Sequence, residues 1–191
     1  LTCAKDANVK RVVFASSSSV FGDSQELPKV ENRIGNQLSP YAVSKRTKEL
    51  YAKVFADVYG LDVVGLRYFN VFGPNQSPNG PYAAAIPLFM EAVLKGESPF
   101  INGDGEQSRD FTFVENAVQA NIKAMFSSKE LKGEVINIAY GGRTTINELF
   151  FILEQNNLEH EEKELLILAS RVKQLRNQIA HGTIDFDFSS R

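Results

Sequence analysis

The sequence predicts an α/β fold built around a parallel sheet. Residues 11–15 and 61–69 are short apolar runs rich in β-branched side chains, as in strands that are buried on both faces. A helix is expected between them, because Ser39 suits the N-cap, Pro40 the first helical position and Gly60 the left-handed stop at the end. Strand, helix and strand in this order make a βαβ unit, whose two strands pair in parallel.

Downstream of residue 74 the pattern changes to a mixture of short helices and strands. Residues 75–81 are rich in Pro, Asn and Gly, which indicates a loop. Thr145 and Glu148 match a capping box for a helix that begins near Ile146. The other predicted elements are helices at 82–95 and 115–127, a turn at 103–105, and short strands at 99–102, 109–114 and 133–140.

The composition excludes several classes of protein. Its 191 residues and 43% hydrophobic content suit a folded domain with a sizeable core. A formal net charge of −2 gives no electrostatic footprint for nucleic acid or an anionic membrane. No stretch approaches the roughly 20 apolar residues that span a bilayer, and no signal-peptide pattern opens the chain. The one cysteine, Cys3, excludes an internal disulfide, so we expect a cytoplasmic protein without a metal site.

One pair of residues carries an acid–base signal. Tyr41 and Lys45 are four apart and therefore project from the same face of the predicted helix. An ammonium group beside a phenol favours the phenolate and lowers the phenol pKa from about 10 towards the neutral range. Alone, such a pair is an ordinary surface feature of helices. Residues 16–19, four serines at the carboxyl end of the first strand, strengthen the signal, because open α/β sheets bind ligands there.

Three linked blocks carry a family resemblance. They are Ser-Ser-Ser-Val-Phe-Gly at 17–22, Ser-Pro-Tyr-Ala-Val-Ser-Lys at 39–45 and Leu-Arg-Tyr-Phe-Asn-Val-Phe-Gly-Pro at 66–74. In this order and spacing, the chain resembles the extended short-chain dehydrogenase/reductases that modify nucleotide sugars, most closely the UDP-N-acetylglucosamine 4-epimerases. The resemblance covers residues 1–153.

The resemblance implies a partial Rossmann-like parallel sheet, NAD as cofactor, a UDP-sugar as substrate and a homodimer. Residues 1–74 would form the NAD-binding catalytic part and residues 75–153 a small α+β region for the UDP-sugar. Residues 154–191, which the resemblance does not cover, would be a helical tail whose origin the sequence does not indicate. By the same resemblance, Tyr41 is the acid/base and Lys45 its electrostatic partner, which also holds the nicotinamide ribose.

Seven further residues match positions of the family. Ser17 matches the catalytic Ser/Thr, and Tyr68 the residue that packs near the nicotinamide. Five residues match substrate-binding positions: Ser18 lining the sugar, Asn70 on the sugar nucleotide, Ala84 leaving room for an N-acetyl group, Phe100 stacking on uracil, and Arg109 on the diphosphate. From the sequence alone, Phe100 is equally compatible with a core position, and Arg109 beside Asp110 with a surface ion pair.

The residues after the first strand discriminate between reactions. Nucleotide-sugar 4,6-dehydratases have a sequence similar to Thr-Asp-Glu at these positions, because the elimination of water needs an additional acid and base. UDP-glucuronate decarboxylases usually keep the glutamate. This chain has Ser18 and Ser19 at those positions. Epimerisation needs only removal of hydride, rotation of the keto sugar and return of hydride, so the serines favour it. The alternatives among nucleotide-sugar reactions are a uronate 4-epimerase, a decarboxylase and a 4,6-dehydratase.

The sequence also departs from the family. It has no Gly-x-x-Gly-x-x-Gly turn and no acidic residue placed to bind the adenosine ribose, and we expect both in sequence upstream of Leu1. The segment that closes over the diphosphate is not recognisable after Glu148. A catalytically dead remnant that acts as a binding or oligomerisation module is therefore the alternative from another class.

The end of the chain predicts an amphipathic helical tail. Its apolar stripe, at alternating spacings of three and four, is Leu165, Leu168, Val172, Leu175 and Ile179. Arg176 and His181 in this tail are similar to the Arg-x4-His motif of HEPN domains, which often act on RNA. Only about eight residues match, so we favour an ordinary helix end with a basic last turn and expect no nucleic-acid partner.

Overall fold

The computed structural model describes residues 1–79 and 84–159 and has the predicted α/β class. The chain divides into two compact units with interleaved sequence. Of the described residues, unit 1 contains 1–71 and 114–141, and unit 2 contains 72–79, 84–113 and 142–159. The predicted tail helix, with its stripe from Leu165 to Ile179, lies outside the described residues.

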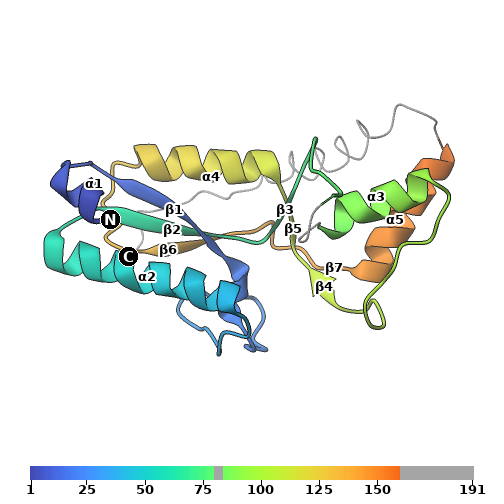
Figure 1. Ribbon diagram of the computed structural model, residues 1–191, viewed down its shortest axis with the longest axis horizontal. Helices are drawn as coiled ribbons and strands as arrows, with labels where there is room; N and C mark the ends of the chain where they lie inside the picture. Colours follow the sequence, from blue (N-terminus) through green and yellow to red (C-terminus); the bar gives the residue numbers. More distant parts are fainter. Residues whose placement is uncertain (80–83, 160–191) are drawn as a thin grey trace. The chain divides into compact units, whose positions relative to one another are not determined.

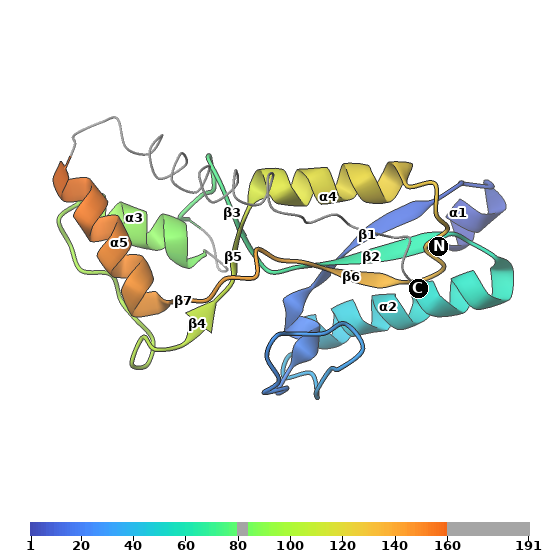
Figure 2. The ribbon, with the colours of Figure 1, turned by 180° about the vertical axis from the view of Figure 1, so that it is seen from behind.

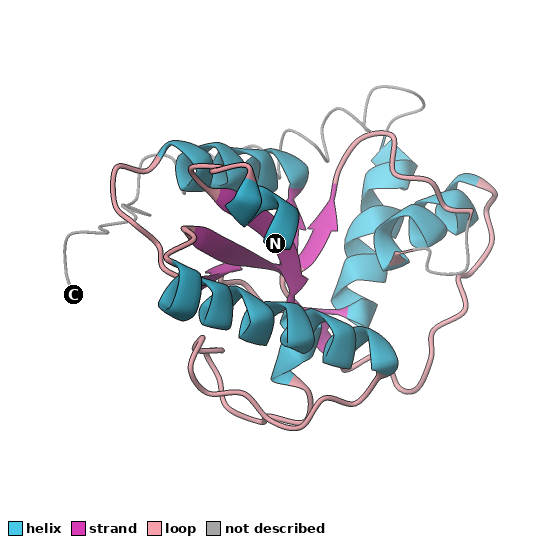
Figure 3. Ribbon diagram, turned by 60° about the vertical axis from the view of Figure 1, so that its left-hand side comes forward, coloured by secondary structure: helices cyan, strands magenta, loops and turns pink. Residues whose placement is uncertain are grey.

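Unit 1 is a three-stranded parallel sheet with a helix on each face. The strand order is β1-β2-β6, and both pairings are parallel. Helices α2 and α4 lie on opposite sides of these strands in Figure 1 and, seen from behind, in Figure 2. Figure 3 shows the strands, in magenta, between the helices. The elements are α1 (Thr2–Asp6), β1 (Val12–Ser17), the 3-10 helix η1 (Ser18–Phe21), α2 (Pro40–Tyr59), β2 (Val63–Tyr68), α4 (Val114–Phe126) and β6 (Val135–Ile138).

The predicted ends of helix α2 are confirmed. Ser39 is the N-cap, with extended backbone, and its Oγ accepts a hydrogen bond from the Ala42 N–H at 3.1 Å. Pro40 begins the helix. Gly60 ends it with φ +66°, in the left-handed region that glycine adopts most readily, and its N–H donates to the Ala56 carbonyl at 3.1 Å. Both ends of α2 are therefore fixed by local chemistry.

Strand burial was predicted correctly for only one of the two apolar runs. In β2 every residue except Tyr68 is buried, as expected of the central strand. The prediction that residues 11–15 are buried on both faces is wrong: Ala15 is exposed and the preceding strand residues are only partly buried. The reason is the position of β1 at the edge of the described sheet. The single strand predicted over 61–69 ends at Tyr68, and a separate strand begins at Asn70.

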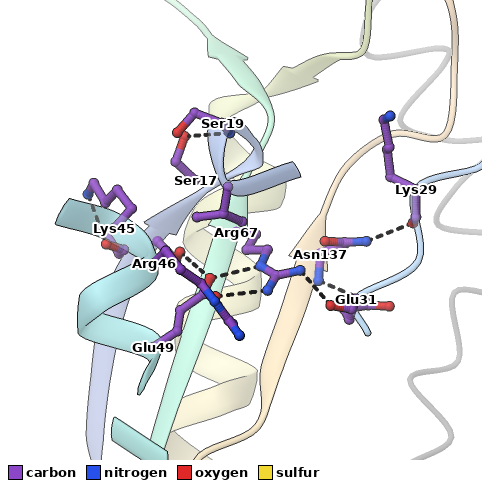
Figure 4. A network of polar contacts seen from close by, with 12 residues as sticks. Ser17, Ser19, Lys29, Glu31, Lys45, Arg46, Glu49, Arg67 and Asn137 are labelled. Carbon is purple, nitrogen blue, oxygen red and sulfur yellow. Dashed lines mark hydrogen bonds and ion pairs between the residues drawn. The ribbon is translucent and has the colours of Figure 1, made fainter. Parts of the chain in front are cut away.

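A charged pair lies inside unit 1, between α2 and the sheet (Figure 4). Arg67 on β2 is fully buried, and Glu49 on α2 is only 2% exposed. The guanidinium donates from Nε to Oε1 and from Nη2 to Oε2 of Glu49, both at 2.8 Å. The Ser16 hydroxyl donates to Oε1 at 2.5 Å, and Arg46 reaches Oε2 from the partly exposed side at 3.1 Å. A buried charge needs such partners, because desolvation penalises every unpaired ionised group.

Unit 2 contains short strands and two helices that pack together. Helices α3 and α5 lie side by side (Figure 2) around Phe89, Val93, Ile146, Leu149 and Leu153. The predicted capping box is confirmed, since the Thr145 N–H donates to Glu148 Oε2 at 2.8 Å and the Glu148 N–H to Thr145 Oγ1 at 3.0 Å. The elements are α3 (Ala85–Leu94), β4 (Ser108–Arg109), β5 (Phe111–Phe113), β7 (Thr144–Thr145) and α5 (Ile146–Glu159). The short strand β3 (Asn70–Phe72) begins in unit 1 and ends in unit 2, and the strand pairs are β3-β5 and β4-β7.

One predicted strand of this region is wrong. Residues 99–102 form no strand, although their sequence is apolar. The side chain of Phe100 is 84% exposed, and Ile101 instead packs at the margin of the helical core. Without a neighbouring strand to complete the hydrogen bonds, this apolar run stays an irregular loop. The turn predicted at 103–105 is present, with Gly103 and Gly105 at φ +77°.

The buried pair makes the stability of the fold dependent on pH. Burial raises the pKa of the Glu49 carboxyl, but the hydrogen bonds from Arg67 and Ser16 lower it by more, so the pKa lies below its ordinary value of 4.5. A carboxyl with a lowered folded pKa stabilises the fold above its unfolded pKa, and this contribution is lost as pH falls through the folded pKa. We therefore expect the free energy of unfolding to decrease from about pH 4.5 downward.

Substitution of Glu49 by Gln tests this prediction. Glu49→Gln leaves the Arg67 charge buried without its counter-charge and should lower the free energy of unfolding by about 3 kcal/mol at pH 7. The difference in free energy of unfolding between the variant and wild type should become smaller below pH 4.5, as measured by urea denaturation at a series of pH values. Glu130→Gln is the control, because its ion pair with Lys132 is exposed and should change stability by less than about 0.5 kcal/mol. An unchanged difference between pH 7 and pH 3 would contradict the prediction.

Candidate active site

The tyrosine and lysine predicted as the acid–base pair lie together at the start of α2. Tyr41 is in the first turn, and its side chain is 56% exposed. Lys45 is one turn later, with its Nζ 5.4 Å from the centroid of the Tyr41 ring. The same Nζ donates to the Ala15 carbonyl at 2.9 Å, which holds the lysine against the end of β1. Because an ammonium group has three donors, this bond leaves donors for a ligand.

Ser17 ends β1 and caps the short helix η1. Its Oγ accepts a hydrogen bond from the Ser19 N–H at 3.2 Å, which leaves its own hydroxyl proton to be donated elsewhere. The sharp turn after η1 requires glycine: Gly22 has φ +54°, and a Cβ there would lie 1.8 Å from the Asn36 carbonyl oxygen. Ser18 lies within η1 and is partly buried. The serine run is therefore an ordered turn at the carboxyl end of the sheet.

Tyr68 lies at the carboxyl end of β2, on the strand next to Ser17. The two residues are register partners in the parallel pair β1-β2. The hydroxyl of Tyr68 accepts a hydrogen bond from Nδ2 of Asn121 on α4 at 2.6 Å. Burial raises the pKa of the Tyr68 phenol above its ordinary value of 10.0, and the bond from Asn121 opposes this only in part. Tyr68 therefore stays a neutral phenol at physiological pH.

The other predicted ligand contacts belong to different parts of the chain. Asn70 begins β3, directly after the end of β2, and is partly buried. Ala84 is the N-cap residue of α3 and is also partly buried. Arg109 is exposed on β4, in register with Thr144, and its Nη1 donates to the Ser108 carbonyl at 2.9 Å. Ala84, Arg109 and Phe100 belong to unit 2.

The structure decides one of the alternatives left open by the sequence. A core position for Phe100 is excluded, because 84% of its side chain is exposed. Five of the predicted residues, namely Ser17, Ser18, Tyr41, Lys45 and Tyr68, lie in unit 1 at the carboxyl ends of β1 and β2 or at the start of α2. This edge of the sheet is where parallel α/β folds bind their ligands.

Sequence reasoning overlooked the polar residues behind this edge. Glu49, Arg67 and Asn121 were not singled out, although each touches an element that carries a predicted site residue. Two signals were available. Glu49 is eight residues after Tyr41 and four after Lys45, so it lies on the same helical face. Arg67 is a charged residue within an apolar strand, where a charge is tolerated only with a partner.

The described residues contain neither a cluster of metal ligands nor a membrane-spanning helix. In residues 1–79 and 84–159, no three or more His, Cys, Asp or Glu side chains are grouped so that they could hold a metal ion. Within the same ranges, no helix has the length and apolar character needed to cross a bilayer.

Comparison with known proteins identifies the family. Residues 1–139 match the model of the NAD dependent epimerase/dehydratase family, which is more than half of the chain, so the chain belongs to this family. A putative UDP-glucose 4-epimerase of Methanocaldococcus jannaschii is 42% identical over 77% of this chain and 47% of its own length. A UDP-N-acetyl-alpha-D-glucosaminuronate decarboxylase of Bacillus cytotoxicus is 36% identical over 82% of this chain and 49% of its own length.

A solved structure agrees with this assignment. The UDP-N-acetylglucosamine 4-epimerase from Methanobrevibacter ruminantium M1, in complex with UDP-N-acetylmuramic acid, is 49% identical with a TM-score of 0.77. The match covers 84% of this chain and 50% of that protein. The chain thus spans about half the length of the curated relatives it matches.

Proposed function

We propose that this chain carries the acid–base residues and part of the sugar-nucleotide site of an NAD-dependent UDP-N-acetylhexosamine 4-epimerase. The observation that carries the proposal is the pairing of Tyr41 with Lys45 at the carboxyl end of the sheet, with the Ser17 hydroxyl at the end of β1. The similarity to a UDP-N-acetylglucosamine 4-epimerase supports the choice of sugar. Membership of the NAD dependent epimerase/dehydratase family supports the cofactor.

The roles follow from the chemistry of each side chain. Tyr41 has an exposed phenol that removes the proton from the C4 hydroxyl of the sugar and later returns it. Lys45 places a positive charge 5.4 Å from the centroid of the Tyr41 ring, where it can interact with charge that develops during the proton transfer. Ser17 keeps a hydroxyl proton, which it donates to the C4 oxygen as that oxygen becomes a carbonyl. NAD, held at its nicotinamide end by Lys45, Tyr41 and Tyr68, would supply the reversible hydride acceptor that oxidation and reduction at C4 require.

The residues of this chain fit one end of the dinucleotide. Lys45 retains N–H donors for the nicotinamide ribose, and Tyr41 and Tyr68 supply aromatic surface for the nicotinamide. The pyrophosphate of NAD has no matching site in this sequence, since the 191 residues include no glycine-rich turn to cradle it. The proposal therefore assigns only the nicotinamide end of NAD to residues of this chain.

Each unit, taken separately, carries residues proposed to contact the UDP-sugar. In unit 2, Phe100 presents an exposed ring, as stacking on uracil requires, and Arg109 an exposed guanidinium, whose charge and planar fork suit a diphosphate. Ala84 at the start of α3 is small enough to leave room for an N-acetyl group. In the other unit, Ser18 and Asn70 would contact the sugar and the nucleotide.

Among the reactions of this family, epimerisation is the one that these residues favour. A decarboxylase is among the relatives, at 36% identity. Decarboxylases and 4,6-dehydratases of this family usually have a carboxylate residue after the first strand. This chain has Ser18 and Ser19 at those positions. A serine hydroxyl cannot supply the additional acid and base that an elimination needs. Conversion of a uronate rather than an N-acetylhexosamine uses the same acid–base residues and is an outcome of the assay below.

A cytoplasmic location is part of the proposal. The single cysteine, Cys3, is a free and exposed thiol, which suits a reducing compartment. Fractionation of cells that produce the protein tests this, and recovery in a secreted fraction would contradict it.

A fused protein tests the proposed epimerase activity. The chain, fused to the N-terminal half of the Methanobrevibacter ruminantium enzyme, should interconvert UDP-N-acetylglucosamine and its C4 epimer. Tyr41→Phe should lower kcat by about 10² to 10⁴-fold, because the phenol acts in the proton transfer. The KM for the UDP-sugar should change little, since the binding contacts are on other residues.

Two controls make the result interpretable. Tyr51→Phe removes a phenol from an exposed position further along α2 and should leave kcat unchanged. UDP-glucuronic acid, assayed in parallel, distinguishes an N-acetylhexosamine epimerase from a uronate epimerase. Full turnover by Tyr41→Phe would contradict the assignment of the base. No turnover with either sugar would favour the alternative of a remnant that only binds or oligomerises.

The second prediction concerns the homodimer, for which we propose α2 as the contact surface. The outer face of α2 carries an apolar stripe in which each side chain is at least 50% exposed: Val43, Leu50, Tyr51, Val54 and Val58. A stripe of this kind is buried when two copies pair. Sedimentation should therefore show dimers of the chain, and Leu50→Lys with Val54→Lys should convert them to monomers.

A matched control is available on the other helix of unit 1. Val118 and Ile122 on α4 are also about half exposed, and lysines there should leave the dimer intact. Loss of the dimer in the α4 variant but not in the α2 variant would contradict the proposed surface.

A further inference from the structure

A row of polar residues crosses the sheet one position before its carboxyl edge. Ser16 on β1 is the register partner of Arg67 on β2, and Arg67 is the register partner of Asn137 on β6. The next row begins with Ser17 and Tyr68, which are proposed site residues. Strands of a sheet with helices on both faces are ordinarily apolar, so a polar row directly behind the proposed site needs an explanation.

Glu49 connects this row to the helix that carries Tyr41 and Lys45. Its two carboxylate oxygens accept the two 2.8 Å bonds from Arg67, and Oε1 also accepts the 2.5 Å bond from Ser16 (Figure 4). Tyr41, Lys45 and Glu49 are spaced by four residues and share one helical face. The helix is thus attached to β1 at two consecutive turns, through Lys45 to Ala15 and through Glu49 to Ser16.

We propose that Ser16, Glu49 and Arg67 are positioning residues for the acid–base site. They fix the first half of α2 against the ends of β1 and β2, and so set the placement of the Tyr41 phenol relative to the Ser17 hydroxyl. This proposal rests on the proposed function of Tyr41 and Ser17. The fork geometry of the pair supports it, because two parallel bonds define the orientation of both side chains, whereas a single bond does not.

The energetics of buried pairs favour the same interpretation. A buried ion pair is weak evidence for stability, since an apolar pair of similar volume often stabilises a fold as well or better. Its distinctive property is orientation. Arg67 extends this orientation further, because its Nη1 donates to the Glu31 carbonyl at 2.8 Å and its guanidinium lies 5.0 Å from the centroid of the Phe21 ring. One side chain therefore aligns the helix, the strand ends and the segment after η1.

A second ion pair in the same unit supplies a matched control. At the opposite ends of β1 and β2, Arg11 pairs with Asp62 at 2.6 Å, with side chains 10% and 15% exposed. Arg11 also donates to carbonyls of residues 124–129, and Asp62 accepts from the Leu131 and Lys132 N–H groups. This pair joins the same strands but has no contact with α2 among its bonds, so it holds the fold without aligning the site.

Amide hydrogen exchange of the full chain tests the proposal. Ser16→Ala removes one bond between β1 and α2 and keeps the buried ion pair intact, so the variant should fold. We expect exchange of the α2 amides from residues 42 to 49 to become about tenfold faster, because the helix start is no longer fixed. Amides 131–134, beside the Arg11–Asp62 pair, should be unchanged. Asp62→Asn should instead accelerate exchange of amides 131–134 and leave amides 42–49 unchanged.

Two further variants test whether the effect on the α2 amides depends on the buried contacts of Glu49. Arg46→Ala removes the partly exposed contact to Glu49 and should leave exchange at residues 42–49 within about twofold of wild type. Glu49→Gln should exceed Ser16→Ala in its effect on the same amides. If Glu49→Gln does not fold, Ser16→Ala decides alone. Equal acceleration in both regions, or in neither, would overturn the proposal, since a residue that only stabilises the fold has no regional effect.

A kinetic measurement separates this proposal from the proposed function. In the fused protein that turns over, Ser16→Ala should lower kcat about tenfold and change KM less than twofold, because misplacement affects the proton transfer more than binding. An unchanged kcat would overturn the positioning role. If wild type shows no turnover, the proposed function fails, and the exchange experiment still decides whether Ser16 and Glu49 fix the start of α2.

Discussion

The buried pair between Glu49 and Arg67 is the interaction on which the organisation of unit 1 depends. It is almost inaccessible to water, and its geometry joins helix α2 to the central strand of the sheet. Each partner would be costly alone, because an ionised group without a counter-charge is strongly disfavoured in a protein interior. The two residues therefore constrain each other, and the elements that carry them are constrained with them.

The proposed site lies at the edge of the sheet that this pair holds in place. Lys45 is one turn before Glu49 on the same helix, and Tyr68 directly follows Arg67 on the same strand. Ser17 directly follows Ser16, whose hydroxyl binds the carboxylate of the pair. In each case a residue of the buried network lies next to a residue with a proposed chemical role, either along the strand or one turn away on the helix. A reaction that depends on proton transfer needs such a fixed scaffold behind its flexible side chains.

The features that the sequence predicted correctly are those with local causes. The ends of α2 follow from Ser39, Pro40 and Gly60, and the start of α5 follows from the capping box of Thr145 and Glu148. Each of these signals acts within a few residues of its own position. The pairing of Tyr41 with Lys45 in space likewise follows from helical spacing alone.

The features that the sequence did not predict depend on partners distant along the chain. Phe100 and Ile101 made a strand at 99–102 plausible, but no strand of the described part of the chain pairs with these residues, which form a loop. The burial of β1 was overestimated because its position at the edge of the described sheet cannot be inferred from its own residues. The pair of Glu49 with Arg67 joins residues 18 apart. A charge within the apolar run of β2 indicates that Arg67 needs a partner, but the sequence does not indicate which residue that partner is.

We propose that these 191 residues hold the acid–base residues of a nucleotide-sugar epimerase, and their sequence includes no glycine-rich cradle for the dinucleotide phosphates. Calorimetric titration of the chain with NAD tests it most directly. Because the glycine-rich turn is absent from the sequence, we predict a Kd no tighter than about 1 mM, and micromolar affinity only after fusion to the N-terminal half of a relative. Micromolar binding of NAD to the isolated chain would contradict the claim.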